Sequence, residues 1–164
     1  MGYKGERLGG DRRAPSSIII NHGVGGDVME KMHGVGKEFF EMPVEDRACL
    51  YLEDPPFEIV RVATSFNINK EKVRSWRDSL RHPVYPPNVL WDKGPKKPLL
   101  YREITSEYSK EMRTLESKLL GLFSEALEVD ENHLYKKFGE QYPQVMNLNY
   151  YLSCPRPDRS SGPL

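Results

Sequence analysis

The sequence has few cysteines, no excess charge and no long apolar run. Its 164 residues contain only Cys49 and Cys154, which cannot build a disulfide framework and indicate a reducing compartment. Lys and Arg together number 24, as do Asp and Glu, so the formal net charge is zero. That balance argues against nucleic acid or an anionic membrane as the main partner. We therefore expect a cytoplasmic protein that binds neither.

The N-terminus lacks a recognisable targeting segment. The run Ile18–Ile20 is far too short for a signal peptide core or a membrane span. Residues 1–14 are rich in glycine and charge and show no periodicity, so we expect a disordered tail there. Apolar residues make up 38% of the chain and charged ones 29%, which is typical of a globular domain of ordinary size.

Turn and cap signals predict the first elements. Residues 16–20 form a short β-branched run before glycines, which predicts a buried strand that ends in a turn. Asp27 is then expected to cap a helix, with Glu30 completing a capping box. A shorter second helix is predicted with Pro43 at its first position. The apolar stripe expected on the first helix consists of Val28, Met32, Val35 and Phe39.

The strongest helical periodicity runs from Leu99 to Leu127. A helix of that length, about 40 Å at 1.5 Å per residue, would form the backbone of the domain. Asp130 is expected to cap a further short helix, which Gly139 would end. The apolar stripe of the long helix consists of Tyr101, Ile104, Tyr108, Met112, Leu115, Leu119, Leu122 and Ala126.

Two segments have the character of strands, and a third does not. Ile59–Ile68 is rich in β-branched residues and predicts a strand, whereas the proline-rich stretch His82–Pro98 predicts a connector without regular structure. From Val145 the apolar period changes to two, which predicts a strand with two unlike faces. One face would carry Met146, Leu148, Tyr150 and Leu152, and the other Val145, Asn147, Asn149 and Tyr151. The polar face is either the wall of a polar pocket or a water-exposed edge.

Five quoted segments, in order, resemble plant 2-oxoglutarate- and Fe(II)-dependent dioxygenases. They are "IINHGV", "EFFEMPVEDRA", "TSFNINKEKVRSWRDSLR", "SEYSKEMRTLESKLLGLFSEALEVD" and "NYYLSCPRPD", and they extend from Ile18 to Asp158. The branch they resemble most contains flavonoid- and salicylate-oxidising enzymes of the downy-mildew-resistance type. The resemblance is strong because the five segments occur in the right order, although a single motif such as Asn-His-Gly would be weak.

The resemblance implies an α+β fold. In this family a mostly helical N-terminal region with one long helix is followed by a double-stranded β-helix, a jelly-roll barrel that holds iron. Residues 15–140 would be the N-terminal region, and residues 141–164 the truncated start of the barrel with its first strand or strands. A lone barrel strand leaves backbone groups unpaired, so residues 142–164 are expected to be poorly held or taken up by the helical region.

The resemblance also implies site residues. The family's "NYYPPCP" motif lies on a barrel strand, and its Asn and second Tyr line the 2-oxoglutarate site. In this sequence they correspond to Asn149 and Tyr151, although Leu152-Ser153 departs from the usual prolines. Phe66 lies on a strand that offers side chains to aromatic substrates in the family. The complete family uses Fe(II), 2-oxoglutarate and ascorbate.

The iron ligands of the family are two His and one Asp, the first two in a His-x-Asp pair. None of the four histidines of this chain begins such a pair. They are His22, His33, His82 and His133. We therefore expect neither metal ligands nor catalytic residues here, and no tight binding of a cofactor. His22 is interpreted as a turn or core histidine, and Trp76-Arg77-Asp78 as a structural turn.

Two functions of different classes remain open. One is the N-terminal part of a dioxygenase that hydroxylates or desaturates a small aromatic, flavonoid- or salicylate-like plant metabolite, and that is inactive alone. The other is a non-catalytic truncated paralogue that acts as a protein-interaction module. In that case a protein partner would cover the exposed apolar face of the helix Leu99–Leu127.

Overall fold

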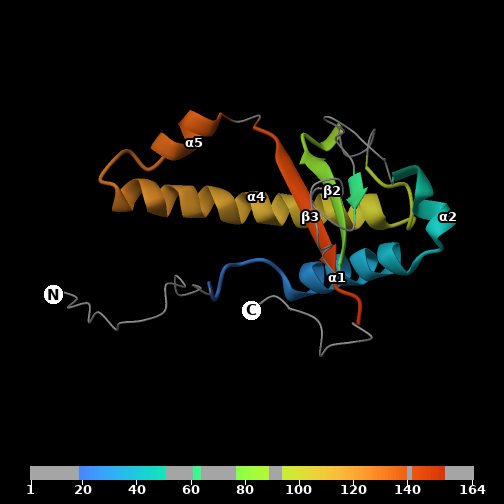
Figure 1. The fold of residues 1–164 in the computed structure, drawn as a ribbon. Helices are drawn as coiled ribbons and strands as arrows, with labels where there is room; N and C mark the ends of the chain where they lie inside the picture. Colours follow the sequence, from blue (N-terminus) through green and yellow to red (C-terminus); the bar gives the residue numbers. More distant parts are fainter. Residues whose placement is uncertain (1–18, 51–60, 64–76, 89–93, 140–141, 154–164) are drawn as a thin grey trace, which may run out of the picture.

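A computed structural model describes residues 19–50, 61–63, 77–88, 94–139 and 142–153. Within them, one long helix lies against a shorter helix and a three-stranded antiparallel sheet of order β1-β2-β3 (Figure 1). A mostly helical α+β architecture is therefore confirmed. In chain order the elements are α1 (Gly26–Glu41), α2 (Val44–Arg47), the 3-10 helix η1 (Ala48–Leu50), β1 (Arg61–Ala63), β2 (Asp78–Tyr85), α4 (Tyr101–Ala126), α5 (His133–Phe138) and β3 (Gln144–Tyr150).

The core lies where α1, the start of α4 and one face of the sheet meet. The predicted apolar stripe of α1 is buried, and Phe39 packs edge-on against Phe40 with ring centroids 5.2 Å apart. Tyr101, the first residue of α4, is fully buried beside Phe39. The buried cluster consists of Met32, Val35, Phe39, Phe40, Val62, Leu80 and Tyr101.

The start of α1 differs from the sequence prediction. Gly25, in an extended conformation, is the N-cap, and its carbonyl accepts the first helical hydrogen bond from the amide of Met29 at 3.2 Å. Asp27 lies inside the first turn, where its negative carboxylate interacts favourably with the positive end of the helix dipole. The capping box was therefore wrong. Ile20 is 75% exposed and Ile19 is also exposed, so the predicted buried strand is absent at these two positions.

The second helix begins one residue later than expected. Pro43 is its N-cap, and the amide of Asp46 donates to the Pro43 carbonyl oxygen at 3.1 Å. The chain then continues into η1. Of the predicted strand Ile59–Ile68, only Arg61–Ala63 is described, and it is β1.

The strand β2 contradicts the prediction that His82–Pro98 lacks regular structure. Residues His82 to Tyr85 complete β2, which is the central strand, and His82 is fully buried. A proline inside a central strand removes a donor from the ladder. Pro83 is accommodated at an irregularity of register, because Pro83 lies opposite Val145 but Tyr85 lies opposite Gln144.

The strand β3 has the two faces that the alternation predicted. Met146, Leu148 and Tyr150 pack against the core cluster, whereas the residues between them are exposed. Residues 142–164 were expected to be either poorly held or taken up by the preceding region. The described part is taken up, because β3 pairs with β2 from Asp78–Tyr150 to Tyr85–Gln144. Leu152 lies beyond the end of β3 and is exposed, so its assignment to the core face was wrong.

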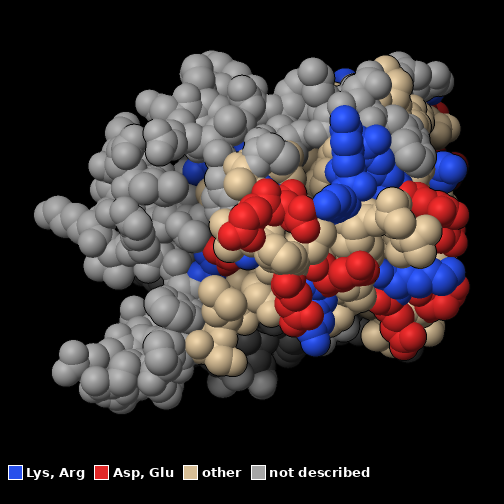
Figure 2. Space-filling model, turned by 90° about the vertical axis from the view of Figure 1, so that its right-hand side faces the viewer, with Lys and Arg blue, Asp and Glu red and all other residues tan. Residues whose placement is uncertain are grey.

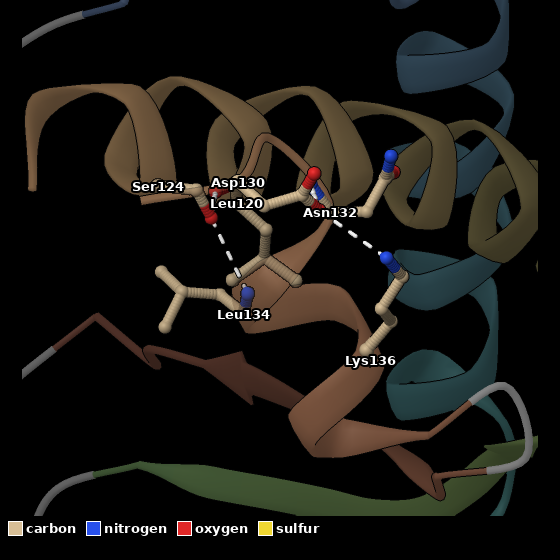
Figure 3. Close-up of polar contacts among 6 residues, drawn as sticks. All are labelled: Leu120, Ser124, Asp130, Asn132, Leu134 and Lys136. Carbon is tan, nitrogen blue, oxygen red and sulfur yellow. Dashed lines mark hydrogen bonds and ion pairs between the residues drawn. The ribbon is translucent and has the colours of Figure 1, made fainter. Parts of the chain in front are cut away.

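The turn between α4 and α5 is held by side chains (Figure 3). The fully buried Ser124 hydroxyl donates to the Leu120 carbonyl oxygen at 2.9 Å and accepts from the Leu134 amide at 3.3 Å. Asp130 Oδ1 accepts hydrogen bonds from the side chain of Lys136 and the amide of Asn132, which lower the pKa of Asp130. The N-cap of α5 is therefore Asn132 rather than Asp130.

The end of α5 follows the prediction. Gly139 closes the helix with a φ of 80°, a left-handed conformation that favours glycine, and its amide donates to the Tyr135 carbonyl oxygen.

The predicted apolar stripe of α4 is packed only along part of the helix. Leu122 and the neighbouring Phe123 are 60% and 57% exposed, and Leu127, just past the helix, is 64% exposed.

Charged side chains of both signs are interspersed on the side of the molecule that carries α2 (Figure 2). Among the described residues drawn there, no single sign dominates, in agreement with the balanced composition. Among the described residues, no helix combines the length and apolar character that crossing a membrane would require.

Candidate functional site

The face of the sheet opposite the core, here called the outer face, carries polar residues in cross-strand rows. Because Val62, Leu80 and Leu148 face the core in one row, their neighbours along each strand face outward. The register makes two outer rows, Arg61–Arg81–Asn147 and Ala63–Ser79–Asn149. The Ser79 hydroxyl donates to the carbonyl oxygen of Ala63 at 3.0 Å.

Asn149 is exposed and makes a side-chain contact on this face. Nη1 of Arg77, the residue before β2, donates to Oδ1 of Asn149 at 3.2 Å. The next residue, Asp78, turns the other way and forms an ion pair with Arg47 at 3.5 Å. Asp78 thus has the predicted structural role, but as the first residue of β2 rather than in a turn, and Trp76 lies outside the described residues.

The neighbouring residues Tyr150 and Tyr151 lie on different sides: Tyr150 packs against the core, and Tyr151 is exposed. The Tyr150 ring stacks on Phe40 with centroids 5.2 Å apart and an interplanar angle of 11°, and its hydroxyl donates to Glu41 Oε1 at 3.3 Å. Tyr151 follows β3 and is 59% exposed. The structure therefore confirms that Asn149 and Tyr151 lie away from the core. Their role toward 2-oxoglutarate stays a prediction, and Phe66 lies outside the described residues.

Sequence reasoning missed the arginines of the outer face. Arg77, Ser79 and Arg81 alternate along the chain with residues that face inward, and the register adds Arg61 from β1. The period of two in "RDSLR" was a usable signal. The prolines that follow it are a competing local signal, because they indicate a loop rather than a strand.

A groove lies between α1, α4 and β3, and Asn149 and Tyr150 are among the residues that line it. It has a volume of about 480 Å³ and a mostly apolar lining that includes Met32, Phe40, Tyr108 and Leu148. Gly36 permits a close approach here, because a Cβ at that position would lie 2.9 Å from Leu148 Cδ2. The groove is therefore an extension of the packing between the helices and the sheet.

The four histidines lie on separate elements. His22 forms a turn in which its Nδ1 accepts from the amide of Val24 at 3.1 Å, as interpreted from the sequence. His33 lies on α1, His133 begins α5, and the buried His82 contacts the Tyr101 hydroxyl. Across the described part of the chain, no three His, Cys, Asp or Glu side chains come together as metal ligands would.

Comparison with known proteins decides the family. Residues 17–105, more than half of the chain, match the family described as non-haem dioxygenase in morphine synthesis, N-terminal. The chain belongs to this dioxygenase family. The resemblance seen in the sequence is thereby confirmed.

Similar dioxygenases place the chain in one branch. It is 40% identical to Protein DOWNY MILDEW RESISTANCE 6 of Arabidopsis thaliana over 144 residues, which are 88% of this chain and 42% of that protein. It is 38% identical to Flavanone 3-dioxygenase 2 of Oryza sativa subsp. japonica, with the same coverage of 88% and 42%. The predicted branch, that of the downy-mildew-resistance type, is confirmed.

A solved dioxygenase structure has the same fold over most of the chain. The crystal structure of JOX2 in complex with 2OG, Fe and JA superposes with a TM-score of 0.75 and 27% identity, covering 85% of this chain and 41% of that one. The family depends on Fe(II) and 2-oxoglutarate. The chain spans about two fifths of the length of these relatives and corresponds to their N-terminal portion.

Proposed function

We propose that the chain is the N-terminal portion of a dioxygenase that hydroxylates or desaturates a small aromatic plant metabolite, and that its outer sheet face helps to hold 2-oxoglutarate. The observation that supports the proposal is the match of residues 17–105 to the family, together with the outward position of Asn149 and Tyr151. Flavanone 3-dioxygenase 2 and the JOX2 complex with JA favour a small metabolite as substrate. The cytoplasmic location and the domain boundaries stay predictions.

The outer face suits the chemistry of 2-oxoglutarate. At neutral pH this dicarboxylate only accepts hydrogen bonds, and the Asn149 amide and the Tyr151 phenol can both donate. In the complete enzyme, iron with 2-oxoglutarate and dioxygen would supply the oxidising chemistry, and the protein residues would position the substrate and exclude water. The residues of this chain would contribute one wall of that site, and the iron ligands would come from other residues.

The proposal includes inactivity of the chain by itself. The test is succinate formation by the purified 164-residue protein with 2-oxoglutarate, Fe(II) and ascorbate, compared with a boiled control. We expect no succinate above that control, because the described residues offer no set of three metal ligands. Clear turnover above the control would overturn this part of the proposal.

A second candidate is the truncated paralogue that acts as a protein-interaction module. The observation that favours it is the exposure of Leu122, Phe123 and Leu127 at one end of α4, where a partner could bury apolar surface. Sequencing of full-length transcripts separates the candidates. An in-frame His-x-Asp shortly after Leu164 would favour the enzyme, and a confirmed stop codon there would favour the module.

A further inference from the structure

We infer that Arg77 is a positioning residue for the dicarboxylate, because it sets which way round the Asn149 amide faces. The inference rests on the proposed function, in which Asn149 lines the 2-oxoglutarate site. Arg77 Nη1 donates to Asn149 Oδ1 at 3.2 Å, and both residues lie at the end of the sheet next to Tyr151. Neither the family resemblance nor the sequence pattern gave Arg77 this role.

The position of Arg77 follows from the strand that it precedes. Asp78 begins β2 opposite Tyr150, and its carboxylate is drawn to the inner face by Arg47, with both side chains largely buried at 10% and 14% exposure. Successive side chains of an extended chain point to opposite faces, so Arg77 points outward. Asn149, opposite Ser79, is then within reach of the Arg77 guanidinium.

The chemistry of the two groups fixes the amide. A guanidinium only donates hydrogen bonds, whereas a side-chain amide has an accepting oxygen and a donating nitrogen. Because Arg77 holds Oδ1, the two N–H bonds of Nδ2 remain for a neighbouring acceptor. The carboxylates and the oxo group of 2-oxoglutarate can only accept. The opposite orientation would turn Oδ1 toward a ligand that cannot donate to it.

The test uses the 164-residue chain with 2-oxoglutarate as the probe, added to tens of millimolar and followed by NMR at the Asn149 side-chain amide. Arg77→Met removes the donor, and Arg77→Lys keeps a donor and the charge. Arg81→Gln is the matched control, because it removes one positive charge from the same face, in the row of Asn147. In the absence of ligand, side-chain ¹⁵N relaxation of Asn149 reports whether the amide is ordered.

We expect Arg77→Met to raise the apparent Kd about three- to tenfold and to disorder the ligand-free amide, since one hydrogen bond is removed. Arg77→Lys should stay within about twofold of the unsubstituted chain, and Arg81→Gln should change the Kd less than Arg77→Met does. Asn149→Asp, which still accepts from Arg77 but has no donor, should lose binding. Because its added negative charge also repels the dicarboxylate, this variant tests contact with residue 149, and the ligand-free relaxation of the Asn149 amide tests its orientation.

Each other outcome counts against a specific claim. If 2-oxoglutarate perturbs Asn149 but Arg77→Met leaves the Kd and the amide order unchanged, the inference is wrong and the proposed site stands. An effect of Arg81→Gln equal to that of Arg77→Met would reduce the role of Arg77 to general charge attraction and also overturn the inference. If neither Asn149 nor Tyr151 responds in the unsubstituted chain, the inference fails, and the proposed site is decided by the KM of Asn149→Ala and Tyr151→Phe in an enzyme completed by a relative's downstream sequence.

Discussion

The Nε2 atom of His82 lies 2.7 Å from the hydroxyl oxygen of Tyr101, and neither side chain is exposed. The other ring nitrogen, Nδ1, lies 3.1 Å from the carbonyl oxygen of Pro83, which can only accept. Nδ1 therefore carries the hydrogen, and Nε2 accepts from the Tyr101 hydroxyl. A neutral imidazole thus joins the central strand β2 to the first residue of α4, and burial lowers the pKa of His82 to about 4.

The first prediction concerns acid stability. His82 has a pKa of about 4 in the folded state, against an ordinary value of 6.5. As the pH falls, His82 is therefore protonated in the unfolded chain at a higher pH than in the folded protein. The contribution of His82 to stability is complete above pH 6.5 and decreases as the pH falls from 6.5 to about 4. The loss over that range is about 3 kcal/mol at most, from 1.36 kcal/mol per pKa unit. Urea denaturation at several pH values measures it.

The control for that prediction is His82→Gln, which cannot titrate. The variant should be less stable at neutral pH. The substitution removes a buried imidazole ring that makes two hydrogen bonds. Its stability should nevertheless depend less on pH between 6.5 and 4 than that of the unsubstituted chain. Parallel pH profiles for the two proteins would show that His82 is not the titrating group.

The second prediction concerns the hydroxyl of Tyr101. Tyr101→Phe keeps the ring in the core but leaves Nε2 of the buried His82 without its donor. An unsatisfied buried acceptor costs about 1–3 kcal/mol of unfolding free energy. Tyr108→Phe, on the same helix and only partly buried, is the matched control and should change the unfolding free energy by less than about 0.5 kcal/mol. Equal effects of the two substitutions would contradict the prediction.

Local periodicity predicted the elements that depend on one face of one segment. The stripe of α1 and the alternation of β3 follow from their own residues, so both were predictable. The strand β2 was missed because Pro83 is a local signal for a loop, whereas the burial of His82 and pairing with both neighbours decide the structure. The contact of Arg77 with Asn149 joins residues 72 apart in sequence, and no local pattern predicts such a pair.

The third prediction concerns Arg113 on α4, whose guanidinium carbon lies 3.8 Å from the ring centroid of Tyr85 and 4.4 Å from that of Tyr142. Arg113 thereby ties the end of β2 and the approach to β3 to the long helix. Arg113→Leu should lower the unfolding free energy by about 1–3 kcal/mol, because it removes two cation–π contacts, and Arg113→Lys should have a smaller effect.

Hydrogen exchange locates the effect of Arg113→Leu. Protection should fall mainly in Gln144–Tyr150, which follows Tyr142, while the first turns of α4 keep theirs. Lys110→Leu, at an exposed position of the same helix, is the control and should leave β3 protected. Loss of protection spread evenly over the molecule would indicate general destabilisation rather than release of β3.

The last prediction tests the two faces of β3 in an active enzyme. When the downstream sequence of a relative such as Protein DOWNY MILDEW RESISTANCE 6 is fused after Leu164, we expect 2-oxoglutarate turnover to return. Tyr151→Phe or Asn149→Ala should then raise the KM for 2-oxoglutarate about three- to tenfold, because each removes a donor to a charged ligand. Tyr150→Phe should leave that KM near its starting value, since its ring stacks on Phe40 and its hydroxyl donates to Glu41. An equal effect of Tyr150→Phe and Tyr151→Phe would mean that the co-substrate does not distinguish the two faces. The outward position of Tyr151 would then have no bearing on its recognition.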